Sequence, residues 1–166
     1  MNTRNILITA ALAASVAGLT AGPALAEERT CRGTIGAVTV DNLRVPQGAT
    51  CRLLGTRIKG TVKVGRRATL AAQRVRVVGN VQAEGARAVN VTGSTVGGSV
   101  QIVQGRSSKL ARSRVNGDVQ YFENRGYISI TGNRVGGNLQ CKENSRRPTG
   151  GGNVVGGNKE DQCARL

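Results

Sequence analysis

The sequence has no histidine and no tryptophan, and its three aromatic residues are Tyr121, Phe122 and Tyr127. Only nine of the 166 residues are acidic. Histidine is the commonest general acid or base, and pairs of carboxylates carry most glycoside hydrolysis. The acids lie near the two ends or singly in turns, and we expect no column of the repeat described below to stack two of them. Acid–base and nucleophilic catalysis therefore lack candidates, and we expect a protein that is not an enzyme and needs no cofactor.

Long hydrophobic runs are missing outside the N-terminus. Residues 1–26 contain Arg4, an alanine-rich apolar stretch and a final Ala-Leu-Ala. This order is typical of a secretory signal peptide, and the small residues predict cleavage after Ala26. The alternative is a membrane anchor, but the apolar run is shorter than the roughly 20 residues that span a bilayer. We therefore expect a secreted protein, located outside the cell or in the cell envelope.

Negative charge is scarce relative to positive charge. The chain carries 24 Lys and Arg, which gives a formal net charge of +15. An excess of this size opposes compaction through self-repulsion, but it attracts anionic partners. Anionic surfaces, anionic polymers and nucleic acids are therefore the partner classes to consider.

The most informative feature that is present is an internal repeat. Segments such as "VVGNVQA" at 77, "VGGSVQI" at 96 and "VNGDVQY" at 115 share a glycine at the third position. These marker glycines are Gly60, Gly79, Gly98, Gly117, Gly137 and Gly157, separated by steps of 19, 19, 19, 20 and 20 residues. Such a period indicates a repeat architecture, in which each copy buries its apolar face against the next copy.

Each copy contains strand patterns separated by turn residues. Val100 and Ile102 alternate with the polar Gln101, which is the period of a half-buried strand, and a second apolar pair such as Val89 and Val91 follows in each copy. We predict an all-β fold, a single-stranded parallel β-solenoid (β-helix) of six to seven coils with disulfide-clipped ends. The predicted boundaries are an N-terminal cap at 27–38, solenoid repeats at 39–154 and a C-terminal cap at 155–166.

Two polar columns accompany the apolar ones. The residue after the marker glycine is usually Asn, Ser, Thr or Asp, and we expect a bend there in which glycine adopts a positive φ. The third residue after the marker glycine is glutamine in several copies, namely Gln82, Gln101, Gln120 and Gln140. This column predicts a ladder of amide hydrogen bonds. Near the C-terminus, Pro148 and the glycine run 150–152 are expected to replace the second strand of the last coil.

Other repeat proteins fit less well. A calcium-binding repeat requires an acid in every copy, whereas Asp118 alone fills the turn column within the central copies. A β-sandwich would not keep its spacing within one residue over six copies. The apolar columns, which are not rich in threonine, also argue against a flat ice-binding surface.

Four cysteines, Cys31, Cys51, Cys141 and Cys163, follow the predicted cleavage site. An even number in an exported chain indicates two disulfides. Residues about one period apart lie on neighbouring coils, roughly 4.8 Å apart, which is within reach of a disulfide. The spacings of 20 and 22 residues therefore predict the pairs 31–51 and 141–163. A metal site is the alternative, but histidine is absent and no cysteines are close in sequence.

Arginine forms a further column. It recurs at Arg57, Arg76, Arg114 and Arg134, interrupted by Thr95, and nine basic residues that include Arg66 and Arg67 separate Asp41 from Glu84 without one acid. A row of guanidinium groups suits phosphates or carboxylates repeated along a polymer. These six arginines are the candidate site for an anionic polymer such as a wall polymer or an acidic polysaccharide. The alternative is that they only keep the protein soluble. Sequence-specific nucleic-acid recognition is not expected, because the aromatic residues are too few for base stacking.

Two resemblances accompany this interpretation. The tail "VGGNLQCKENSRRPTGGGNVVGGNKEDQC" resembles the ending of small secreted bacterial proteins of unknown function that share a Gly-Asn-rich, two-cysteine C-terminus. The valine-glycine repeats resemble bactofilins, which are polymer-forming β-helices of bacteria, although the signal peptide and the cysteines depart from that pattern. The first resemblance implies secretion and a solenoid. The second implies the alternative function of a structural protein that associates end to end. An enzyme acting on polysaccharides ranks third.

Overall fold

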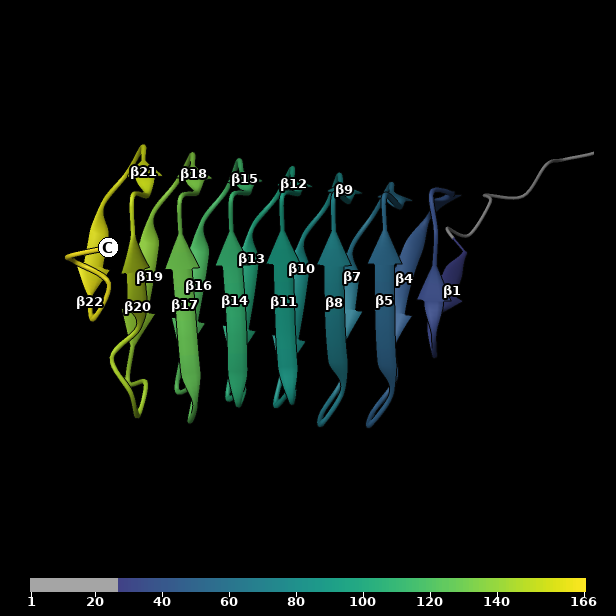
Figure 1. Cartoon of the computed structure of the whole chain (residues 1–166), viewed down its shortest axis with the longest axis horizontal. Coiled ribbons are helices and arrows are strands. Elements are labelled where there is room, and N and C mark those ends of the chain that lie inside the picture. The colour runs from purple at the N-terminus through teal and green to yellow at the C-terminus, as the bar shows by residue number, and fades with distance from the viewer. Residues whose placement is uncertain (1–26) are drawn as a thin grey trace, which may run out of the picture.

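The computed structural model describes residues 27–166, and the predicted signal peptide at 1–26 lies outside the described residues. The described chain is a parallel β-solenoid of about seven coils, each about 19 residues long (Figure 1). Every strand pairing is parallel, and no helix occurs between residues 27 and 166, so none could cross a membrane there. The predicted fold class is confirmed.

Each coil passes through three sheets in turn. Sheet A contains β1 (Glu28–Thr30), β4 (Asn42–Val45), β7 (Val62–Val64), β10 (Val81–Glu84), β13 (Val100–Val103), β16 (Val119–Phe122), β19 (Leu139–Lys142) and β22 (Lys159–Asp161). Sheet B contains β2 (Thr34–Ile35), β5 (Thr50–Leu54), β8 (Thr69–Gln73), β11 (Ala88–Thr92), β14 (Ser107–Ala111), β17 (Tyr127–Thr131) and β20 (Thr149–Gly151). Sheet C contains β3 (Thr39–Val40), β6 (Arg57–Ile58), β9 (Arg76–Val77), β12 (Thr95–Val96), β15 (Arg114–Val115), β18 (Arg134–Val135) and β21 (Val154–Val155).

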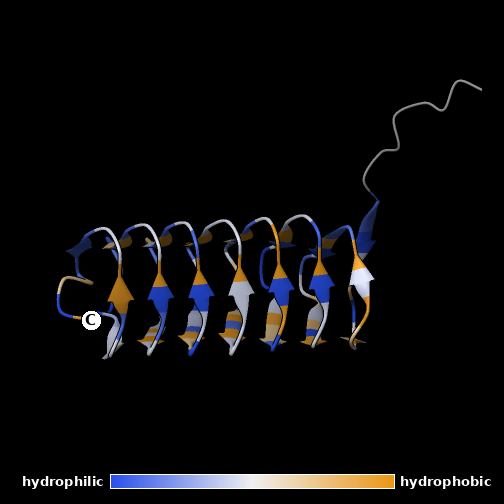
Figure 2. Ribbon diagram, turned by 90° about the horizontal axis from the view of Figure 1, so that it is seen from above, coloured by the Kyte–Doolittle hydropathy of each residue, from blue (hydrophilic) through white to orange (hydrophobic). Residues whose placement is uncertain are grey.

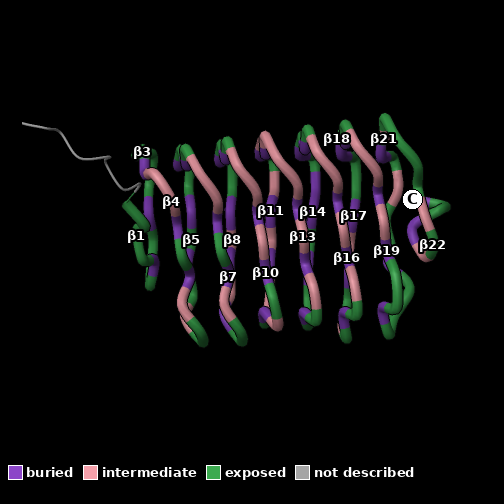
Figure 3. Tube along the Cα trace, turned by 180° about the vertical axis from the view of Figure 1, so that it is seen from behind, coloured by how far each residue is buried: buried purple, intermediate pink, exposed green. Residues whose placement is uncertain are grey.

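The core lies between the three sheets and consists of stacked Val, Leu and Ile side chains. Figure 3 shows buried and more exposed residues alternating along the coils. The largest buried side chain is Tyr121, which faces the small Ser108 and lies 3.2 Å from its hydroxyl oxygen. Burial raises the pKa of Tyr121 to about 12, and the hydrogen bond with Ser108 opposes this rise. Tyr121 is therefore a neutral core residue.

The marker glycines do not adopt a positive φ, so that part of the prediction is wrong. They are glycines because the coils approach closely at this point. A Cβ atom on Gly79 would lie 2.7 Å from the carbonyl oxygen of Gly60 and 2.8 Å from the Oγ1 atom of Thr61. Apart from Gly150, Gly151 and Asp161 near the C-terminus, the positive φ values occur instead at the corners that lead into and out of sheet B.

Both predicted polar columns form ladders along the solenoid. In the column after the marker glycine, Asn80 Oδ1 accepts a hydrogen bond from the main-chain N–H of Ser99 in the next coil, at 2.8 Å. In the glutamine column, Gln101 Nε2 donates to Gln120 Oε1 at 2.9 Å, and Gln140 ends the ladder by donating to Glu160 at 2.8 Å. The glutamine ladder is confirmed.

Asparagine side chains at the buried corners between sheets form a further set of hydrogen bonds. Asn133 Oδ1 accepts from the N–H of Ser113, and Asn133 Nδ2 donates to the carbonyl oxygen of Leu110, both at 2.9 Å. Asn124 makes the equivalent bonds at the corner between sheets A and B, to Gly105 and Ile102. No buried side-chain nitrogen or oxygen of residues 27–166 lacks a partner. These columns therefore satisfy main-chain groups that the turns leave unpaired.

One disulfide lies near each end, with the predicted pairing. The Cα atoms of Cys31 and Cys51 are 5.6 Å apart, and those of Cys141 and Cys163 are 5.2 Å apart. The segments 27–38 and 155–166, expected as caps, also contribute strands, because β1 pairs with β4 and β22 pairs with β19. The expectation that the glycine run replaces the last strand of sheet B is wrong. The run contributes to β20, which pairs with β17.

Candidate functional site

The four column arginines lie on sheet C, in register from coil to coil. Arg57 pairs with Arg76 and Arg114 pairs with Arg134, while Thr95 separates the two pairs. We call Arg57, Arg76, Arg114 and Arg134 the Arg row. In Figure 2 the strands of sheet C appear as a line of arrows in which the arginine positions are blue and the two threonine positions are pale. The predicted column therefore forms one line on one side of the protein, interrupted at Thr95.

Strand length explains why these arginines point outward. Each strand of sheet C has two residues, and side chains on a strand alternate between its faces. The second residue, for example Ile58 after Arg57, is fully buried in the core. The first residue must therefore face solvent, and all four arginines of the row are exposed.

Two further arginines, which we did not select from the sequence, stand beside the Arg row. Arg74 and Arg112 occupy the corner between sheets B and C with φ values of 51° and 47°. Neighbouring coils place glycine at this corner, as in Gly93 and Gly132, because a side chain in this left-handed conformation costs about 1 kcal/mol. The alternation of glycine and arginine at one corner was visible in the sequence and could have identified both residues.

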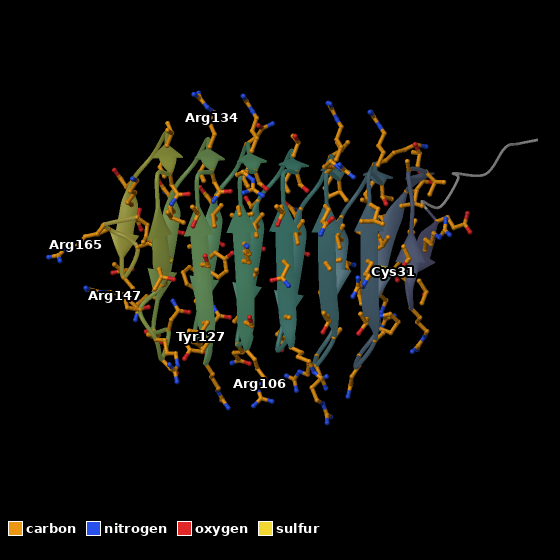
Figure 4. The ribbon with its side chains drawn as sticks, in the orientation of Figure 1. Cys31, Arg106, Tyr127, Arg134, Arg147 and Arg165 are labelled. Carbon is orange, nitrogen blue, oxygen red and sulfur yellow. A yellow bond between two sulfur atoms is a disulfide. The ribbon has the colours of Figure 1, made fainter. Side chains whose placement is uncertain are left out.

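The two remaining predicted arginines, Arg66 and Arg67, do not join the row. They lie at the corner between sheets A and B, where the side chains enclose a groove of about 790 Å³. We call the following set the Arg groove: Arg66, Arg67, Arg106, Arg125, Arg146 and Tyr127. Figure 4 shows Arg134 of the row at one edge of the solenoid and Arg106 and Tyr127 at the opposite edge. The six predicted arginines therefore divide between two separate surfaces.

Main-chain hydrogen bonds place the arginines of this corner in a second column. The N–H of Arg106 donates to Ala86, directly before Arg87, and the N–H of Arg125 donates to Gly105, directly before Arg106. Arg87, Arg106 and Arg125 therefore occupy equivalent places in three successive coils. They follow the marker glycines by the same number of residues, so this column too was detectable in the sequence.

Tyr127 gives the groove an aromatic wall. The residue is 70% exposed, and the guanidinium carbon of Arg146 lies 4.4 Å from the centre of its ring. Arg146 also donates a hydrogen bond to the Tyr127 hydroxyl group at 3.0 Å. In the preceding coil the register partner of Tyr127 is Ser107, whose side chain is too small to cover the ring.

Few carboxylates neutralise these surfaces. Three ion pairs occur within residues 27–166, namely Lys59 with Asp41, Arg66 with Glu84, and Lys142 with Glu143. None includes an arginine of the row, and only Arg66 of the groove is paired. The strands of sheets B and C contain no acid, so the described acids lie on sheet A, at its corners and at the chain ends.

One column does stack two acids, contrary to the expectation from the sequence, because Glu123 and Glu143 occupy equivalent corners of successive coils with φ values of 55° and 57°. No three acids and cysteines of the described chain are grouped as metal ligands would be, and all four cysteines are joined in disulfides. The expectation that the protein is not an enzyme remains a prediction. What the arrangement offers chemically is guanidinium donors in fixed rows, which bind phosphate, sulfate or carboxylate oxygens in pairs.

Comparison with known proteins adds no relative. No protein-family model, no curated protein and no solved structure matches this chain.

Proposed function

We propose that the protein is a secreted, non-catalytic protein that binds an anionic polymer of the cell envelope or the extracellular space along the Arg row. The observation that carries this proposal is the register of Arg57 with Arg76 and of Arg114 with Arg134, all exposed and without a carboxylate partner.

The energetics of the row favour an anionic ligand. Two like charges held about 4.8 Å apart repel by about 0.9 kcal/mol even at the dielectric constant of water. Nothing in sheet C offsets this repulsion, because its strands contain no acid. A polymer with regularly spaced phosphate, sulfate or carboxylate groups would convert the repulsion into attraction at each coil. The rigid main-chain ladder would keep the arginine backbones at a constant spacing, so the entropy lost on binding would come from the side chains and not from the main chain.

Binding across a salt series tests the proposal. The ligands are a wall polymer, an acidic polysaccharide, heparin and duplex DNA, and the variant replaces the four arginines of the row by glutamine. The matched control replaces Arg29, Arg32, Arg52 and Arg165 by glutamine, which removes equal charge from exposed positions outside the row. We expect the row variant to lose most of its salt-sensitive affinity for a wall polymer or acidic polysaccharide, and the control to keep it. Equal losses in the two variants would reduce the row to general surface charge, and a preference for DNA would overturn the choice of polymer.

A structural, self-associating protein is the second candidate. The outer edges of β1, β2 and β3 have no neighbouring strand within residues 27–166, and such edges can pair with another copy. At the other end, the turn after β22 buries Cys163 and Leu166 against the core. Because this turn covers one end of the stack, unlimited end-to-end growth ranks below polymer binding. Sedimentation of the purified protein over a concentration range would distinguish the two.

A further inference from the structure

We propose that the Arg groove is a second and separate binding site, which takes a single sugar ring that bears a phosphate or sulfate group. The anionic group would contact Arg106 and Arg125, and the sugar ring would lie against Tyr127. This inference does not depend on polymer binding along the Arg row, since the two surfaces lie at opposite edges of the solenoid (Figure 4).

The charge of the groove points to a tetrahedral anion. Of its five arginines, only Arg66 has a carboxylate partner, Glu84 at 3.0 Å. Arg67, Arg106, Arg125 and Arg146 have none among residues 27–166. A single carboxylate offers two oxygens and one charge, whereas a phosphate or sulfate ester offers three free oxygens, and a phosphate ester carries up to two charges. Guanidinium groups from successive coils can share such oxygens.

The main chain is altered at this groove. Arg125 is in register with Arg106, and Tyr127 is in register with Ser107, so Gly126 is an extra residue between them. It accounts for the first step of 20 residues in place of 19. A Cβ atom at Gly126 would overlap the carbonyl oxygen of Arg106, and only glycine fits there. Inserted residues of this kind often re-aim a side chain beside a binding site.

The re-aimed side chain is Tyr127, the one strongly exposed aromatic residue of the described chain. Arg146 holds the ring from one side, at 4.4 Å, and also binds its hydroxyl group. The small Ser107 leaves the side toward the preceding coil uncovered. An exposed, fixed aromatic ring suits the apolar C–H face of a sugar, and its position among unpaired arginines places an acidic substituent within their reach.

The backbone of Arg67 is consistent with this assignment. Arg67 has a φ of 56°, a conformation that glycine adopts in the equivalent corner of the preceding coil, at Gly48. Its N–H donates to Gly85, another residue of the groove lining. A long cationic side chain is therefore held at the groove in a backbone state that costs about 1 kcal/mol.

Calorimetric titration of the purified, disulfide-bonded protein tests the proposal. The probes are glucose 6-phosphate, glucose 6-sulfate, inorganic phosphate, glucose and adenosine monophosphate. We expect saturable binding of at least one of the two sugar esters, with an affinity about tenfold or more above that of inorganic phosphate, because the ring adds contacts with Tyr127. The sugar phosphate and sugar sulfate arms identify which anionic group is preferred.

Two variants and one control separate the contributions. Replacing Arg106 and Arg125 by glutamine should weaken binding of the preferred sugar ester by about tenfold or more, because charge-assisted hydrogen bonds are lost. Tyr127→Ala should remove the preference for the sugar ester over the inorganic anion. The Arg row variant should bind as the unaltered protein does, so failure of the row would leave this result intact. Thermal melting verifies that each variant is folded.

Three results would overturn the proposal. They are no saturable binding of either sugar ester, equal affinity for inorganic phosphate, or tighter binding of adenosine monophosphate, which would assign the groove to a nucleotide.

Discussion

Polar side chains repeat from coil to coil both inside and outside the solenoid, but the two sets differ in what they contact. Inside, Asn133 and Asn124 each accept a hydrogen bond from a main-chain N–H of the preceding coil and donate another to a carbonyl oxygen. Outside, Arg57 and Arg76 stand in register with no carboxylate partner. The inner columns are explained by folding, because a buried main-chain group must be paired. The outer columns are not.

This difference shows how to interpret repetition in a solenoid. A residue that recurs in every coil is evidence of function only when its neighbours in the stack do not bond to it. The glutamine ladder of sheet A lies outside but is bonded from Gln82 through to Glu160, so it belongs with the inner columns. The Arg row and the Arg groove remain as the surfaces that folding does not explain.

The stability of the protein should be sensitive to the loss of a single buried asparagine amide. Asn133→Ala would leave the N–H of Ser113 buried without its partner and would remove a second hydrogen bond, to the carbonyl oxygen of Leu110. Since an unpaired buried group costs roughly 1–3 kcal/mol and a lost hydrogen bond about 1 kcal/mol, we expect the free energy of unfolding to fall by about 3–4 kcal/mol. Urea unfolding followed by circular dichroism measures this. The control is Asn116→Ala at an exposed position, with an expected change within about 0.5 kcal/mol; similar losses in both variants would remove the contrast between inside and outside.

Substitution in the marker glycine column should cause the next largest loss of stability. Gly79→Ala would force a Cβ atom to within 2.7 Å of the Gly60 carbonyl oxygen, which is part of a fixed coil. Overpacking of this kind costs about 3 kcal/mol, again measured by urea unfolding. Gly36→Ala is the matched control, because no atom lies within 4 Å of its added Cβ. If the Gly79 variant kept full stability, close approach of the coils would not be the reason for the glycine.

Burial of Tyr121 predicts a loss of stability at high pH. Desolvation raises the pKa of Tyr121 to about 12 from its ordinary value of 10.0 in the unfolded chain. The unfolded chain therefore releases the phenol proton at a lower pH than the folded protein, and stability falls as the pH rises from 10 towards 12. The full difference corresponds to about 2–3 kcal/mol.

Tyr121→Phe separates this effect from all other titrations. The variant keeps the ring in the core, and Ser108 retains its hydrogen bond to the carbonyl oxygen of Val89. Unfolding measured in parallel from pH 9 to 12 should show a steeper decline for the unaltered protein. Parallel curves would mean that the Tyr121 hydroxyl group is solvated.

Much of the fold was predictable because the period appears directly in the residues. The spacing of the marker glycines gave the coil length, and the coil length in turn gave both disulfide pairs and the register of Arg57 with Arg76. The conformation of those glycines was not predictable, because the need for glycine arises from the neighbouring coil and not from the local turn. A sequence pattern alone does not separate close approach from positive φ.

The candidate site was only half predictable. Position in the repeat places Arg57 and Arg134 in one row, since both precede a buried residue of sheet C. The Arg groove depends on Gly126, which moves Tyr127 by one residue relative to Arg125, and on corners whose turns differ between coils. Position in the repeat does separate Arg66 and Arg67 from the row, since they follow Gly60 whereas Arg57 precedes it. The groove that they line together with Tyr127 was not predictable from that position.

The smallest predicted change in the free energy of unfolding is a gain, not a loss, and it concerns the exposed arginines of the Arg row. Replacing the four arginines of the row by glutamine removes two adjacent like-charged pairs, each repelling by about 0.9 kcal/mol at most. We expect the free energy of unfolding to rise by about 0.5–1 kcal/mol at low salt, and the gain to vanish at about 1 M salt, where the screening length is about 3 Å. The variant with Arg29, Arg32, Arg52 and Arg165 replaced should gain less, because those residues are not stacked on one another. A loss of stability in the row variant would show that the fold uses these arginines, and the row would then need no ligand to explain it.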